Sequence, residues 1–118
     1  MLMCMVQIIM NMFIFLPSFM FVMMMLAAAR VELHVHLDGA IAPQTLFDIA
    51  TARNLTLPLV GRPKSVSDID RLLAAQTPFG QFDVVNDIVG GDTWSLQLVA
   101  ERFVHAQAAV GVNYTEVR

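Results

Sequence analysis

The chain has 118 residues, a formal net charge of −3 and a single cysteine, Cys4. The acidic balance provides no basic footprint for a nucleic-acid backbone, so we expect no nucleic-acid partner. One cysteine excludes an internal disulfide and zinc sites that are built on a Pro-Cys-x-x-Cys segment.

Residues 1–29 are an apolar segment, since Arg30 is the first charged residue. Roughly 20 consecutive apolar residues are enough to span a bilayer, so membrane contact through this segment is one expectation. Ala27-Ala28-Ala29 is typical of a signal-peptide cleavage site, although the positively charged start is missing. Three interpretations stay open: a signal peptide or membrane anchor, a non-native stretch from a gene-model artefact, and an apolar core helix. The protein would be cytoplasmic if the stretch is not native, and membrane-bound or secreted otherwise.

The next segment is predicted to be a strand, because polar and apolar side chains alternate along it. One face of this strand would carry the four polar side chains of Glu32, His34, His36 and Asp38. Two imidazoles that project the same way can converge on one ion, and neutral imidazole is a good zinc ligand. The sequence therefore predicts half of a metal site, at His34 and His36. The alternative is that both histidines lie on a solvated strand face.

A series of helices is predicted to follow. Pro43 is typical of a first helical turn, and the helix should end in the Pro- and Gly-containing segment 54–64. Ser65 followed by Asp68 indicates a capping box at the start of a second helix. Pro78 then interrupts the chain before two phenylalanines at helical spacing.

A longer helix and a second strand are predicted after the Gly-containing turn at residues 90–93. Gly111 is typical of the residue that ends a helix, and residues 112–118 alternate as a strand does. His105 falls in the helix and is not a predicted ligand. The apolar stripe of this helix would consist of Leu96, Val99, Phe103, Ala106 and Val110. A strand, a helical crossover and another strand imply a parallel pair.

The run from Val31 to Ile41 resembles the opening strand of the adenosine deaminase family of zinc-dependent hydrolases, and Gly111 to Arg118 is similar to that family's second strand. The resemblance implies an α/β fold, the first strand-helix-strand portion of a (β/α)8 TIM barrel, preceded by an apolar helix. A complete barrel needs about 250 residues. We therefore expect residues 30–118 to be the truncated N-terminal part of such a barrel, after the apolar segment 1–29.

The resemblance also implies a function: zinc-dependent hydrolytic deamination of adenosine and deoxyadenosine to inosine by the full-length protein. His34 and His36 would bind zinc, and Asp38 would accept a hydrogen bond from a sugar hydroxyl. Phe79 and Phe82 best match an apolar wall over the substrate, with ordinary core packing as the alternative. The implied substrate-binding residues are His36, Asp38, Gly39, Phe79 and Phe82.

Three further expectations concern activity. The family's other zinc ligands and its catalytic residues would lie beyond Arg118, so we expect the chain alone to be inactive. A related aminopurine, adenine or N6-methyl-AMP, is the alternative substrate. A non-catalytic, membrane-inserted truncated product is the alternative of a different class.

Overall fold

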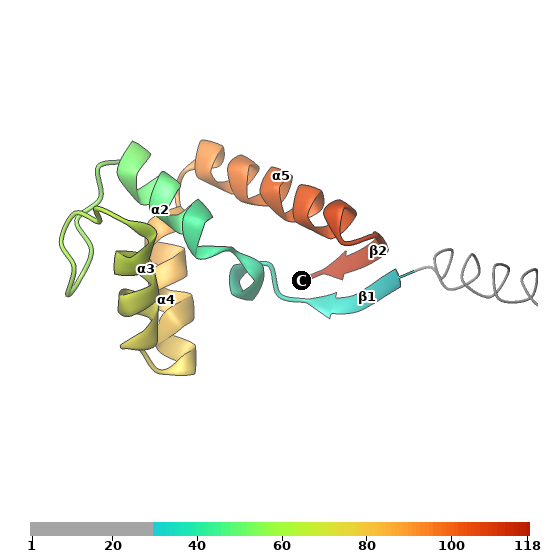
Figure 1. The fold of residues 1–118 in the computed structure, drawn as a ribbon, viewed down its shortest axis with the longest axis horizontal. Coiled ribbons are helices and arrows are strands. Elements are labelled where there is room, and N and C mark those ends of the chain that lie inside the picture. The colour runs from blue at the N-terminus through green and yellow to red at the C-terminus, as the bar shows by residue number, and fades with distance from the viewer. Residues whose placement is uncertain (1–29) are drawn as a thin grey trace, which may run out of the picture. The chain divides into compact units, whose positions relative to one another are not determined.

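The computed structural model describes residues 30–118, which form a group of helices with a small two-stranded sheet at one end. In the described part, strand β1 (Arg30–Val35) leads into a short 3-10 turn, η1 (Asp38–Ala40). Helices and the second strand follow in the order α2 (Pro43–Ala52), α3 (Val66–Ala74), α4 (Pro78–Val89), α5 (Thr93–Ala109) and β2 (Val112–Val117). Figure 1 shows α2, α3 and α4 gathered away from the strands, with α5 reaching back to β2. The predicted apolar helix over residues 1–29 lies outside the described residues.

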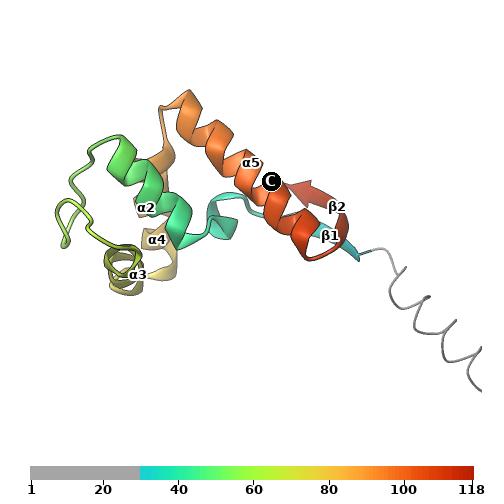
Figure 2. The ribbon, with the colours of Figure 1, turned by 45° about the horizontal axis from the view of Figure 1, so that its top comes forward.

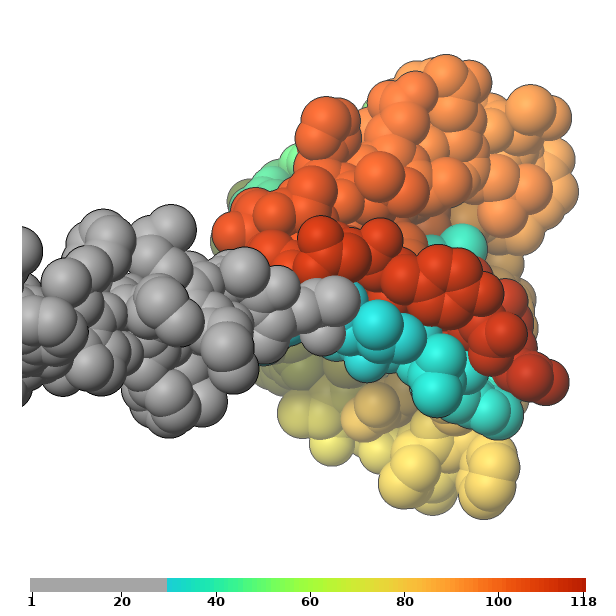
Figure 3. Space-filling view, turned by 90° about the vertical axis from the view of Figure 1, so that its right-hand side faces the viewer, coloured from blue at the N-terminus to red at the C-terminus, as the bar shows by residue number. Residues whose placement is uncertain are grey.

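The two strands form a parallel pair. The N–H of Arg118 donates to the carbonyl of Val35 at 2.8 Å, and the N–H of Leu37 donates to the carbonyl of Arg118 at 3.2 Å. Arg118 thus bonds to the residues on either side of His36, as a residue in a parallel ladder does. The predicted parallel pair is therefore confirmed. Figure 3 shows the two strands lying alongside each other, with α5 above them.

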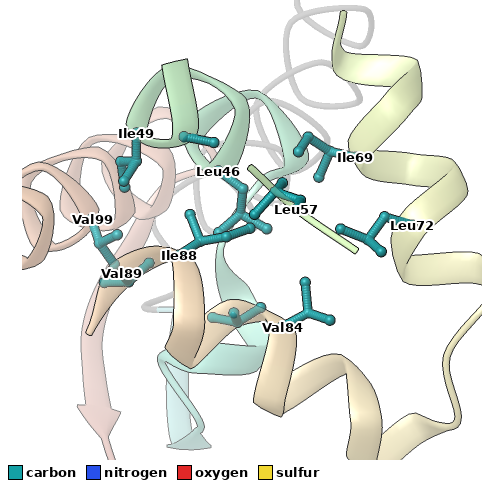
Figure 4. Close-up of a cluster of buried hydrophobic side chains, with 11 residues drawn as sticks. Leu46, Ile49, Leu57, Ile69, Leu72, Val84, Ile88, Val89 and Val99 are labelled. Atoms are coloured by element: carbon teal, nitrogen blue, oxygen red, sulfur yellow. The ribbon is translucent and has the colours of Figure 1, made fainter. Parts of the chain in front are cut away.

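The buried core lies among the helices rather than under the sheet. In the described chain, every residue of β1 and β2 is at least partly exposed. Figure 4 shows how side chains from α2, α3, α4 and the first half of α5 point toward one another. The core side chains with no exposed surface include Leu46, Ile49, Ile69, Leu72 and Ile88. The helical part thus contains the core, and it contacts η1, just after β1, through α4 and contacts β2 through α5.

Side chains at the predicted positions begin the helices. Pro43 is the first residue of α2, and Asp68 accepts hydrogen bonds from the N–H of Lys64 at 2.8 Å and of Ser65 at 3.1 Å. The Lys64 hydrogen bond is the largest cause of a lowered Asp68 pKa. These contacts confirm the predicted helix starts at Pro43 and at the Ser65 capping box.

The start of α5 depends on Asp92. Its carboxylate accepts from the Ser95 hydroxyl at 2.5 Å and from the Ser95 N–H at 2.8 Å. The hydroxyl contact is the main cause that lowers the Asp92 pKa. At its other end the helix stops before Gly111, whose φ of +76° is the left-handed conformation expected of a helix-ending glycine.

Polar contacts between residues far apart in the sequence connect α5 to β1 and to α2. Gln107 Nε2 donates to Glu32 Oε2 of β1 at 2.8 Å, and Arg102 Nη1 lies 2.6 Å from Asp48 Oδ2 of α2. Figure 2 shows α5 running from the helices to the sheet, as these two contacts require. Within residues 30–118, α5 and the shorter helices all fall short of the length and apolar character that a membrane crossing needs.

Candidate metal centre and substrate groove

The structure brings the imidazoles of His34 and His36 together. Their Nε2 atoms lie 3.0 Å apart, and the ring centroids are separated by 5.0 Å with a tilt of 40° between the planes. His34 lies within β1, and His36 directly follows the last residue of that strand. Strand alternation therefore places both side chains on one face, as predicted.

The spacing of the two nitrogens fits a tetrahedral metal. Two ligands at a Zn–N distance of about 2.0–2.1 Å and a tetrahedral angle have nitrogens about 3.3 Å apart, which is close to the observed 3.0 Å. The same spacing also fits one Nε2–H donating to the other Nε2. Within residues 30–118, no group of three or more His, Cys, Asp or Glu side chains could hold a metal. The described residues therefore show two candidate ligands and no complete site, and the ligand role of the pair stays a prediction.

The alternation predicts that Asp38 continues the strand face of His34 and His36. The structure contradicts this prediction. β1 ends at Val35, and Asp38 is the first residue of η1. The turn is closed by the N–H of Gly39, which donates to the His36 carbonyl at 3.1 Å and to Asp38 Oδ1 at 2.9 Å. Aspartate competes in this way for nearby backbone N–H groups and so favours turns over extended backbone. The strand prediction therefore holds as far as His36, whose two neighbours bond to Arg118, and was wrong at Asp38.

Asp38 nevertheless shares a groove with His36. This open groove has a volume of about 300 Å³, at the lower end of the range for small-molecule sites. It lies where η1, α4, α5 and the carboxyl end of β2 meet. Its lining consists of His36, Leu37, Asp38, Ile41, Val85, Asn86, Val89, Leu96, Val99 and Arg118. The arrangement can bind a mostly apolar ligand that carries a few polar groups near His36.

Of the other predicted substrate residues, Gly39 and Phe82 lie together at the turn, and Phe79 does not. A Cβ atom added to Gly39 would lie 3.5 Å from Cε1 of Phe82, so the ring packs directly on η1. Phe79, one turn earlier on α4, is 84% exposed. The structure therefore brings Gly39 and Phe82 together and directs Phe79 elsewhere, and their substrate roles stay predictions.

Two groove residues were missed from the sequence. Arg118 follows β2 as His36 follows β1, so the parallel register could have indicated that both side chains line the same groove. Asn86 lies four residues after Phe82 on α4, and this helical spacing places the two on one face. The sequence carries no signal for which face of α4 turns toward the groove.

A second open groove of about 380 Å³ lies between α5 and β2. Its walls come from Phe103, Val104 and Gln107 of the helix and from Tyr114 and Thr115 of the strand, among others. Neither histidine of the candidate metal pair lines it. His105 is exposed on α5 and is placed outside that pair, as predicted.

Comparisons with known proteins agree with the resemblance. Residues 29–118 match the family model described as Adenosine deaminase. The chain is 35% identical over 91 residues to "Adenosine deaminase" of Mus musculus, which covers 75% of this chain and 26% of that protein. It is 36% identical over 92 residues to "Adenosine deaminase" of Bos taurus, covering 75% and 25%. The chain thus spans about a quarter of the length of these curated relatives.

Proposed function

Because the chain belongs to the adenosine deaminase family, we propose that the complete protein hydrolyses adenosine or deoxyadenosine to inosine and ammonia. The described residues would supply two zinc ligands and one wall of the substrate site. The remainder of the metal site and the catalytic residues would come from chain beyond Arg118, which would complete a (β/α)8 barrel. Residues 1–118 alone would then be inactive.

The observation that carries the proposal is the 3.0 Å separation of the His34 and His36 Nε2 atoms. His34 and His36 would hold the zinc, and a bound zinc would supply the activated water that hydrolytic deamination needs at neutral pH. Each histidine must be neutral with a free lone pair on Nε2, so each ring must carry its proton on Nδ1. The chain's contribution would be to hold the two rings at the required spacing.

Asp38 would orient the substrate. Its Oδ1 accepts the N–H of Gly39 at 2.9 Å, which fixes the carboxylate and leaves Oδ2 to accept a sugar hydroxyl. The carboxylate lies in the same groove as His36, so the sugar would be held at a fixed place relative to the metal. Adenine lacks the sugar and would leave Asp38 without this partner.

Phe82 would form part of the apolar wall against the base, because it packs on the turn that carries Asp38. Phe79, with its exposed ring, would join this wall only on substrate binding. Gly39 would allow the backbone to approach the ligand.

A second candidate substrate, N6-methyl-AMP, is favoured by one observation. Arg118 lines the groove with Asp38, and a guanidinium is a good phosphate partner. Its nearest carboxylate partner, Glu116 Oε2, lies 4.0 Å away, which is a weak contact. A membrane-inserted, non-catalytic product remains the alternative that depends on residues 1–29, outside the described part of the chain.

The test is turnover by the complete gene product that carries residues 1–118. We expect conversion of adenosine to inosine, loss of that conversion on treatment with a chelator and its return on addition of Zn²⁺. Adenine and N6-methyl-AMP serve as competing substrates in the same assay. Preferential turnover of either one would replace the proposed substrate, and turnover that ignores the chelator would contradict the metal site.

A further inference from the structure

Helix α4 presents an amide to the groove that holds His36 and Asp38. Asn86 lines this groove between two apolar neighbours on the same helix, Val85 and Val89. The placement of α4 is fixed, because Phe82, four residues before Asn86, packs on Gly39 of the turn. The placement of α4 thus puts Asn86 at the groove.

The amide is not required by the core. On α4, the buried positions are Val84, Val85, Ile88 and Val89, and Asn86 is exposed. Within residues 30–118 its side chain has no hydrogen-bond partner, although its carbonyl oxygen accepts from the N–H of Gly90 at 2.7 Å. A solvated polar group that faces a largely apolar groove is free to bond a ligand.

The chemistry of the amide complements that of Asp38. An ionised carboxylate only accepts hydrogen bonds, whereas an amide both donates and accepts, as a sugar hydroxyl does. A ribose offers several hydroxyls, so a carboxylate and an amide that line one groove can bind different hydroxyls of the same sugar. The apolar side chains between them would contact the base.

We propose that Asn86 is a specificity-determining residue that hydrogen-bonds one ribose hydroxyl of the bound purine nucleoside. The inference rests on the proposed function, since it places a nucleoside in the groove beside His36. It goes beyond that function because it assigns discrimination between nucleosides and their deoxy forms to α4, which contributes no metal ligand.

The experiment measures binding and does not depend on turnover. The complete gene product, its Asn86→Leu variant and an Asp87→Leu control are titrated calorimetrically with inosine and with 2′-, 3′- and 5′-deoxyinosine. Asp87 is the next residue on α4, is exposed and does not line the groove. Circular dichroism spectra verify that the three proteins have the same helix content.

The deoxyinosine that lacks the hydroxyl bound by Asp38 should bind weakly to all three proteins. We expect a second deoxyinosine, which lacks the hydroxyl bound by Asn86, to bind the unmodified protein about three- to tenfold more weakly than inosine, the usual range for one neutral hydrogen bond. This ratio should fall to about one in Asn86→Leu and stay unchanged in Asp87→Leu. Unchanged ratios in Asn86→Leu for all three deoxy forms would overturn the inference, even if chelator-sensitive deamination holds. Absence of inosine binding, or a change confined to inosine 5′-monophosphate in a parallel titration, would overturn it as well.

Discussion

Replacing Gly39 by alanine allows an effect on the stability of the fold to be distinguished from an effect on substrate binding. A methyl group at this position would lie 3.5 Å from Phe82 Cε1 and 3.9 Å from Cζ, which is ordinary van der Waals contact. Replacing a glycine by alanine at a compatible position stabilises a protein by about 0.4–1 kcal/mol, because the unfolded chain loses freedom. For a domain of this size each kcal/mol shifts Tm by about 4–8 °C. We therefore expect Gly39→Ala to leave Tm unchanged or to raise it by several degrees.

Gly90→Ala is the matched control, because the same methyl group would there lie 2.5 Å from the Asn86 carbonyl oxygen. Overpacking of this kind costs about 1–3 kcal/mol, so thermal unfolding followed at 222 nm should show a lower Tm. In the complete gene product, Gly39→Ala should reduce kcat/KM for adenosine while the fold persists. A Tm as low as that of Gly90→Ala would refute the packing argument, and a stable, fully active Gly39→Ala would refute close approach of the substrate to the turn.

Three further predictions concern the core, acid stability and the metal pair. Ile88→Ala should lower the free energy of unfolding by about 2–5 kcal/mol in urea titrations, because Ile88 is fully buried. Leu59→Ala is the control, since Leu59 is 78% exposed and its replacement should change the free energy of unfolding by less than about 0.5 kcal/mol. The pKa of Asp92 is lowered, chiefly by the hydroxyl of Ser95. The ionised carboxylate should therefore stabilise the fold above the ordinary aspartate pKa, and this stabilisation should be lost as pH falls through the lowered pKa. Asp92→Asn should make Tm depend less on pH in that acidic range, and an unaltered profile of Tm against pH would contradict this role. His36→Ala should weaken Zn²⁺ binding by more than the 10–100-fold typical of losing an outer partner, and equal weakening by His105→Ala would show that the paired imidazoles are not the ligands.

Local alternation predicted the histidine pair because a strand has only two faces. The same rule failed two residues later, where the carboxylate of Asp38 bonds to the next backbone N–H and starts a turn. The spacing of polar residues alone does not show which side chain will accept a hydrogen bond from the neighbouring backbone N–H and so start a turn. The strand was therefore predicted correctly where it carries the imidazoles and wrongly where the chain leaves the sheet.

Periodicity also predicted α5 but not what covers it. Of its apolar stripe, Val99 is buried, whereas Leu96 and Val110 are 53% and 56% exposed. Spacing by three and four defines one face of a helix, but burial depends on elements that pack from elsewhere in the chain. Asn86 was missed for the same reason, since its position in the groove results from how α4 meets η1.

The parallel pairing of β1 and β2 has a consequence for the nascent chain. Gln107 and Glu32, which join α5 to β1, are 75 residues apart in sequence, so at about 5–20 residues per second the ribosome needs roughly 4–15 s to deliver the second partner. The helical core can form from shorter loops in that interval, because nearby segments meet at a lower entropic cost. The first strand, with its imidazoles, must therefore wait unpaired while translation continues, and during that time its open edge can pair with strands of other chains.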